Sequence, residues 1–196
     1  YMPASCSREA VRAFDTGPGN MLIDYAMEHF YGSKYDADGA TAQKGKVYGC
    51  MLYELMQIEF ITARPPKSTG RELFSRDMFD RLVLKYENLP PEDIVATLAE
   101  FTARSIVVNI ELYADARSKL VASGGGAKNE YIMRRLKELL PLSTVLKSTE
   151  LGFDIDAKEA IAFAFLAYLR LARIPANMQS VTGAERDALL GGVFLP

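Results

Sequence analysis

A strand–turn–helix–strand pattern in the second half of this sequence constrains the fold more than any other feature. Two short β-like runs occupy residues 119–123 and 142–147. Between them lie a glycine turn at residues 124–126 and a helical stretch over residues 130–140, which Asn129 is placed to cap. Strands separated by a crossover of this length pair in parallel, because an antiparallel connection needs only a short turn. We therefore expect an α/β chain with a small parallel sheet flanked by many helices.

Helical periodicity dominates the rest of the chain. One helix is expected over residues 21–30 with Gly32 as its stop, and another in the first part of residues 47–61. Asp77 is expected to cap a short amphipathic helix that reaches residue 87. The longest helix is predicted over residues 92–114, and its apolar positions indicate a buried stripe: Ile94, Leu98, Phe101, Ile106, Ile110 and Leu112. Helix is expected to exceed strand at least twofold, with no linker that marks a domain boundary.

Composition excludes several classes of protein. The chain has 196 residues, of which 49% are apolar, with a formal charge of −2 and one histidine. These values exclude a disordered chain, a collagen and a disulfide scaffold. The charge balance offers no basic surface for nucleic acid or a membrane, and one histidine excludes a histidine-rich metal site. The longest apolar stretch, residues 160–169, is too short to span a bilayer, and Cys6 and Cys50 lack a paired spacing, which indicates a reducing compartment.

The first candidate for chemistry is Asp15, in the sequence Phe-Asp-Thr-Gly-Pro-Gly-Asn of residues 14–20. A Gly-Pro-Gly turn that opens a helix places this carboxylate beside backbone N–H groups able to hold an anion. The alternative is a loop aspartate satisfied by those same local N–H groups.

The second candidate is the glycine turn, formed by Gly124, Gly125 and Gly126 and followed by Asn129. Without side chains, the turn lets a ligand lie directly on the backbone. It also sits at the carboxyl end of a predicted parallel strand, where α/β proteins bind ligands. The spacing matches neither a P-loop nor a dinucleotide fingerprint, and a tight turn without a ligand is the alternative.

The third candidate is Glu159, at the start of a helix predicted over residues 156–173. Asp156 at the N-cap and Glu159 three residues later resemble a capping box, which is the structural alternative. The apolar run that follows places Glu159 at the edge of the core, where a carboxylate can work as an acid or a base.

Five segments in a fixed order resemble the anhydro-N-acetylmuramic acid kinase family, which belongs to the superfamily of sugar kinases, heat-shock cognate proteins and actin. They are residues 14–20, 65–72 (Pro-Pro-Lys-Ser-Thr-Gly-Arg-Glu), 124–129, 159–164 and 180–184. The resemblance covers the C-terminal half of the family's chain. It implies that residues 1–196 form a single C-terminal, ribonuclease-H-like lobe of a two-lobed, actin-like ATPase fold. The N-terminal lobe, which carries the first phosphate loop, is absent from this sequence.

The resemblance also implies a reaction. In the family, ATP phosphorylates O6 of 1,6-anhydro-N-acetylmuramic acid while water attacks the anomeric carbon and opens the anhydro bridge. By this resemblance Asp15 is the general base towards that water, and Glu159 is a second acidic residue that polarises or positions the substrate. The glycine turn and Asn129 match the adenosine-side motif, and Mg²⁺ bridges phosphate oxygens. No role is assigned to Lys67 or Arg71.

The expected product is N-acetylmuramic acid 6-phosphate, made during recycling of cell-wall sugars in the cytoplasm. The expected cofactors are ATP and Mg²⁺, and the expected partner is an anhydro-amino-sugar, with no nucleic acid and no membrane; a homodimer is left open. This chain alone is expected to be inactive or nearly so. Two other hypotheses are a nucleotide-binding or regulatory module without chemistry, and a packing or dimerisation piece built on the long helix. Asp15 and Glu159 together favour the kinase, because a binding module needs neither.

Overall fold

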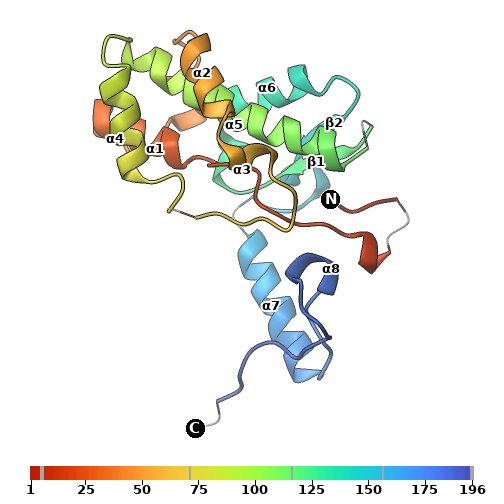
Figure 1. The fold of residues 1–196 in the computed structure, drawn as a ribbon. Coiled ribbons are helices and arrows are strands. Elements are labelled where there is room, and N and C mark those ends of the chain that lie inside the picture. Colours follow the sequence, from red (N-terminus) through yellow and green to blue (C-terminus); the bar gives the residue numbers. More distant parts are fainter. Residues whose placement is uncertain (5–6, 71, 116, 156, 195–196) are drawn as a thin grey trace.

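Figure 1 shows the computed structural model of the chain, which describes residues 1–4, 7–70, 72–115, 117–155 and 157–194. Most helices form one body around α5, from which α7 and α8 project (Figure 1). In the order of the chain, with η for a 3₁₀ turn, the elements are η1 (Arg8–Ala10), α1 (Met21–Tyr31), η2 (Ala37–Gly39), α2 (Gly49–Met56), α3 (Glu59–Thr62), α4 (Arg76–Lys85), α5 (Pro91–Tyr113), β1 (Lys119–Ala122), η3 (Gly125–Lys128), α6 (Glu130–Leu139), β2 (Thr144–Lys147), η4 (Ser148–Leu151), α7 (Lys158–Leu171) and α8 (Gln179–Thr182).

The strand–turn–helix–strand prediction is confirmed. β1 and β2 pair in parallel, with Lys119 opposite Thr144 and Ala122 opposite Lys147. The chain crosses from one strand to the other through η3 and α6, and α6 contacts β2. The two strands have four residues each, whereas α5 alone has 23, so the expected excess of helix is also confirmed for the described residues.

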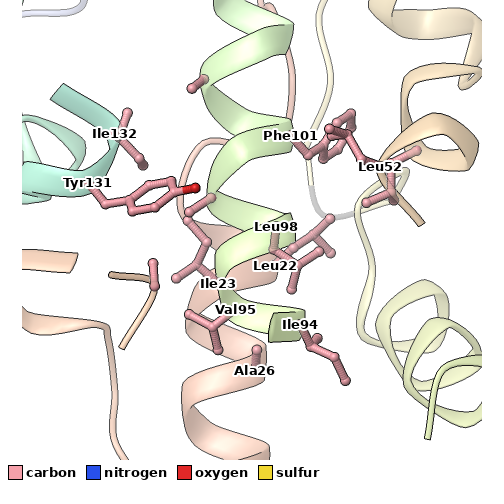
Figure 2. Packing of buried hydrophobic residues seen from close by; sticks show 14 of the residues in the cluster. Leu22, Ile23, Ala26, Leu52, Ile94, Val95, Leu98, Phe101, Tyr131 and Ile132 are labelled. Atoms are coloured by element: carbon pink, nitrogen blue, oxygen red, sulfur yellow. The ribbon is translucent and has the colours of Figure 1, made fainter. Parts of the chain in front are cut away.

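α5 forms the centre of the core. Pro91 occupies its first turn, where the missing N–H costs nothing, and residues 94–103 are all buried because α1, α2 and α6 pack around the helix. The predicted stripe is confirmed in its first half, but Leu112 is 53% exposed because the last turn of α5 reaches the surface. Figure 2 shows the packing, with side chains from four helices: Leu22, Ile23 and Ala26 of α1, Leu52 of α2, Ile94, Val95, Leu98 and Phe101 of α5, and Tyr131 and Ile132 of α6.

The helix ends follow from local sequence. Gly32 ends α1 with a φ of +63°, a left-handed conformation that glycine adopts without steric cost. The Asn129 side chain caps α6, as predicted. The prediction that Asp77 caps α4 is wrong: the Ser75 hydroxyl accepts the Met78 N–H at 3.2 Å, and Asp77 lies in the first turn instead. Serine is as good an N-cap residue as aspartate, so Ser75 caps the helix and α4 begins at the next residue, Arg76.

A buried ion cluster joins α5 to α6. Glu100 of α5 is 2% exposed, and Arg135 of α6 donates two hydrogen bonds to its carboxylate, at 2.6 and 2.9 Å. Arg104, one turn further along α5, donates another at 2.7 Å. Burial alone would raise the pKa of Glu100, but the hydrogen bonds and charges of the two arginines outweigh burial and hold the pKa below its usual range.

α7 lies within the predicted helix 156–173, but it has no buried residue. Its sequence is apolar on every side, and large side chains are exposed along it: Ile161, Phe163, Phe165, Tyr168 and Leu171. The expectation that Glu159 lies at the edge of the core is therefore wrong for this chain, because α7 projects away from the body (Figure 1). No helix in the described part of the chain is both long and apolar enough to cross a membrane.

The segment that contains α8 folds back onto the N-terminal segment. The Ser180 hydroxyl donates to the Arg8 carbonyl at 2.8 Å, and the Arg8 guanidinium donates to the carbonyl of the buried Asn177 at 3.1 Å. These bonds place residues 180–184 beside the segment that leads to Asp15.

Candidate active site

Three of the segments singled out in the sequence meet around one cavity. Its volume is about 450 Å³, within the usual range for small-molecule sites. The lining comes from the segment before α1, the loop after α3, and α8: Ala13, Phe14, Asp15, Pro66, Lys67, Ser68, Val181 and Thr182. These segments are far apart in the sequence, so the fold brings them together.

The loop after α3 holds Asp15 through three hydrogen bonds. The Asp15 N–H donates to the Lys67 carbonyl at 3.1 Å. Its Oδ2 accepts the Ser68 hydroxyl at 2.9 Å and the Thr69 N–H at 2.8 Å. Among the described residues, no donor reaches Oδ1. The half-buried carboxylate therefore keeps one oxygen available to a molecule in the cavity.

Lys67 anchors this loop. Its ammonium donates to the carbonyls of Phe60 and Ile61 at the end of α3, at 2.9 and 3.0 Å. It also lies over the rings of Phe14 and Phe60, 5.7 and 4.9 Å from their centroids. Burial lowers the pKa of the ammonium. Lys67, which the sequence left without a role, thus fixes the segment beside Asp15, whereas Arg71 lies outside the described residues.

The backbone that follows Asp15 lies directly on α5. A Cβ at Gly17 would lie 2.5 Å from Oγ and 2.9 Å from Cβ of Ser105, so only glycine fits there. Two residues later, the Thr102 hydroxyl donates to the Gly19 carbonyl at 2.7 Å. The glycine-rich sequence after Asp15 therefore has a packing requirement in addition to any ligand.

Asn109 completes a polar stripe on α5 with Thr102 and Ser105. All three side chains are buried, and their spacing puts them on one face of the helix. Asn109 Nδ2 donates to the Ile61 carbonyl at 3.0 Å and reaches the Thr16 carbonyl at 3.5 Å. The stripe thus holds both segments that carry the Asp15 site. Sequence analysis missed it, although small polar residues at helical spacing inside an otherwise apolar helix are a readable signal.

The glycine turn forms between β1 and α6, as predicted. Gly124 has a φ of +76°, a conformation that favours glycine. The amide of Asn20 lies beside the turn, 3.6 Å from where a Cβ of Gly125 or Gly126 would be. Asn20 occupies the N-cap position of α1 but makes no capping hydrogen bond. The turn therefore lies next to the end of the segment that begins with Asp15, a proximity that the sequence did not predict.

Asn129 supports the turn from within. It is buried, and its Oδ1 accepts the Ile132 N–H at 3.1 Å. The same oxygen would lie 2.4 Å from a Cβ at Gly39, so Asn129 also packs closely against η2. Its amide oxygen is therefore engaged in capping α6, and its ATP-binding role stays a prediction.

Glu159 is not brought to Asp15. It lies exposed in the first turn of α7, and it is not among the residues that line the cavity. The capping box is not found either, because Ala157 occupies the N-cap position without a side-chain bond. Asp156 itself lies outside the described residues.

The described residues do not form a metal cage, since no three histidine, cysteine, aspartate or glutamate side chains gather in that part of the chain. Mg²⁺ that accompanies ATP usually takes only one or two carboxylates and completes its shell with phosphates and water. Mg²⁺ that arrives with ATP therefore does not require such a cage.

A larger cavity, of about 640 Å³, lies between α1 and α4 and includes His29 and Arg76. None of the predicted site residues lines it. His29 is exposed, and its ring meets those of Phe30 and Phe79 edge to face. The larger volume therefore does not coincide with the predicted site residues, whereas Asp15 and its loop line the smaller cavity.

Comparison with known proteins gives a consistent result over nearly the whole chain. A family model described as anhydro-N-acetylmuramic acid kinase matches residues 5–196. A protein of that name from Haemophilus influenzae is 44% identical over 197 residues, which cover 95% of this chain and 52% of the relative. Its namesake from Acaryochloris marina is 44% identical over 205 residues, covering 100% and 54%, and that from Clostridioides difficile 40% over 195 residues, covering 98% and 51%. The chain spans about half the length of the curated relatives it matches.

Proposed function

Because the chain belongs to the anhydro-N-acetylmuramic acid kinase family, we propose that it forms the C-terminal half of an ATP-dependent kinase for 1,6-anhydro-N-acetylmuramic acid. The observation that carries the proposal is the meeting of Asp15, the loop after α3 and α8 around one cavity. The activity is proposed for the longer protein, since this chain spans about half of its relatives. The products are N-acetylmuramic acid 6-phosphate and ADP.

In the proposed reaction, Asp15 activates the water that opens the anhydro bridge. Oδ1 accepts a hydrogen bond from water, orients it towards the anomeric carbon and takes its proton as the new C1–O bond forms. The bond between the anomeric carbon and O6 breaks, and O6 attacks the γ-phosphorus of ATP with ADP as the leaving group. The hydrogen bonds to Oδ2 support this role, because they leave Oδ1 without a donor among the described residues, and Asp15 lines the cavity.

The glycine turn is the proposed nucleotide side of the site. Gly124, Gly125 and Gly126 expose backbone at the carboxyl end of β1, next to the Asn20 amide. Mg²⁺, as the companion of ATP, supplies charge neutralisation on the phosphates. Glu159 is proposed as a second acidic residue of the assembled enzyme only, since in this chain it stands apart from the cavity.

Residues 1–196 are proposed to be one ribonuclease-H-like lobe of a two-lobed enzyme. A helix that is apolar on every side belongs in an interior, and nothing in the described part of this chain covers α7. The relatives are about twice as long, so a second lobe can cover it. The proposed location is the cytoplasm, where ATP is available.

The test is Asp15→Asn in the longer protein, with ADP release measured at saturating anhydro sugar and ATP. The change keeps the shape of the side chain and removes its ability to take a proton. If Asp15 is the base, turnover should fall by about 10²–10⁴-fold with little change in either affinity.

A melting curve on the same variant gives the control. If Asp15 serves only to satisfy its loop, the substitution should cost about 1 kcal/mol of stability and leave turnover nearly intact. That outcome would remove Asp15 from the catalytic site. ADP release that does not depend on the anhydro bridge of the sugar would contradict the proposed substrate.

A further inference from the structure

The carboxylate of Asp15 is held asymmetrically. Ser68 Oγ and Thr69 N both donate to Oδ2, at 2.9 and 2.8 Å, while no described residue donates to Oδ1. The torsion that rotates a carboxylate about its Cβ–Cγ bond is broad and easily changed, so an aspartate in a loop has no fixed orientation of its own. Two donors that converge on one oxygen supply that orientation.

The segment that carries these donors is itself immobilised. Lys67, directly before Ser68, is bonded through its ammonium to two carbonyls at the end of α3, and through its own carbonyl to the Asp15 N–H. Asn109 in turn donates from the buried face of α5 to Ile61, one of those two residues of α3. A continuous set of bonds therefore runs from the core helix to the Ser68 hydroxyl without involving a ligand.

We propose that Ser68 is a positioning residue that fixes the Asp15 carboxylate so that Oδ1 alone faces the reacting water. This proposal rests on the proposed function, in which Asp15 is the general base. Ser68 acts through Asp15: its hydroxyl is committed to Oδ2. A general base must lie within about 3 Å of the water oxygen it deprotonates, and a displacement of about 1 Å can cost roughly 100-fold in rate. The Thr69 N–H belongs to the backbone, so it keeps part of the orientation when the Ser68 side chain is changed.

The test compares Ser68→Ala with Ser68→Thr in the longer protein. Ser68→Ala removes the donor and should lower kcat by about 10- to 100-fold, while KM for the anhydro sugar and for ATP stays unchanged. Ser68→Thr keeps a hydroxyl and should restore most of kcat. Ser68 is exposed, so the melting temperature should not move in either variant. Ser33→Ala, at an exposed serine outside the cavity, is the matched control.

A double variant separates failure of this proposal from failure of the proposed function. If Ser68 acts only through Asp15, adding Ser68→Ala to Asp15→Asn should produce no further loss. A normal kcat in Ser68→Ala together with an inactive Asp15→Asn would overturn the positioning role and leave the function standing. A rise in KM instead of a fall in kcat would also overturn it, because the hydroxyl would then contact the substrate. Full turnover in Asp15→Asn would overturn the proposed function itself.

Discussion

Gly17 shows how the absence of one side chain sets the position of a carboxylate two residues away. Its backbone lies against Ser105, on a helix that is fixed by the core, so the segment that follows Asp15 is held closely against α5. The same closeness explains why Gly-Pro-Gly alone does not indicate an anion site. In this sequence one glycine is needed for packing and Gly19 for its positive φ of +58°.

Gly17→Ala should therefore lower the free energy of unfolding by about 1–3 kcal/mol, as expected for overpacking. The Cβ of Ser105 belongs to a rigid helix and cannot rotate away, so Ser105→Gly should relieve part of the loss even though glycine costs about 1 kcal/mol inside a helix. Chemical denaturation of the two single variants and the double variant measures this coupling.

Gly49→Ala is the matched control, because a Cβ at Gly49 would meet no atom within 4 Å. Gly49 has an ordinary negative φ at the start of α2, so alanine should leave stability unchanged or raise it by about 0.4–1 kcal/mol. Equal effects at positions 17 and 49 would contradict the close packing of the Asp15 segment on α5.

At the scale of elements, α5 combines two roles that the sequence presents as one. Its apolar positions predicted a packing helix, and that prediction is correct for Ile94, Leu98 and Phe101. Its polar residues would ordinarily be read as a solvated face, yet Glu100 and the stripe that includes Ser105 are buried. Some of their partners lie on α5 itself, such as Arg104 for Glu100 and the Thr102 carbonyl for Ser105. Others come from distant segments, such as Arg135 for Glu100, and no local pattern reveals those.

The ion cluster predicts a large difference between two adjacent arginines of α6. Arg135 pairs with the buried Glu100, whereas Arg134 is half exposed and pairs with Glu138 on the surface. Arg135→Met should cost about 3 kcal/mol, the lower end for a broken buried pair, because Arg104 still neutralises part of the charge. Arg134→Met should cost less than about 1 kcal/mol. Similar losses in urea denaturation would show that the cluster does not join the two helices.

The stability lost in Arg135→Met should depend on pH in a definite direction. The pKa of Glu100 lies below its ordinary value of 4.5, so its ionised form contributes stability above pH 4.5. This contribution disappears as the pH falls through the lowered pKa. The difference in stability between the native chain and Arg135→Met should therefore shrink below about pH 4.5, and a difference that grows there would contradict the pairing.

At the scale of the whole molecule, features that depend on neighbouring residues could be predicted from the sequence, and features that depend on contacts between distant segments could not. The parallel pair and the cap at Asn129 were predictable, because a strand, a turn and a helix within 30 residues leave few alternatives. The cavity was not, since it depends on contacts between Asp15 and Ser68 and between residues 8 and 180, which are set by packing in three dimensions. α7 shows the reverse case: its sequence predicts burial, yet nothing in the described part of the chain buries any of its residues.

α7 therefore supplies the last prediction. Phe163 on α7 and Leu84 on α4 are both 71% exposed in this chain. Their exposure alone therefore predicts the same change in stability when either is replaced by serine. If the other lobe covers α7, Phe163→Ser in the longer protein should lower the free energy of unfolding by about 3 kcal/mol, while Leu84→Ser should stay within about 0.5 kcal/mol. In the chain of 196 residues alone, Phe163→Ser should reduce the self-association measured by sedimentation velocity, because exposed apolar surface promotes association between molecules. Equal and small effects of the two substitutions in the longer protein would mean that α7 remains a surface helix, and the two-lobed arrangement would lose its main structural support.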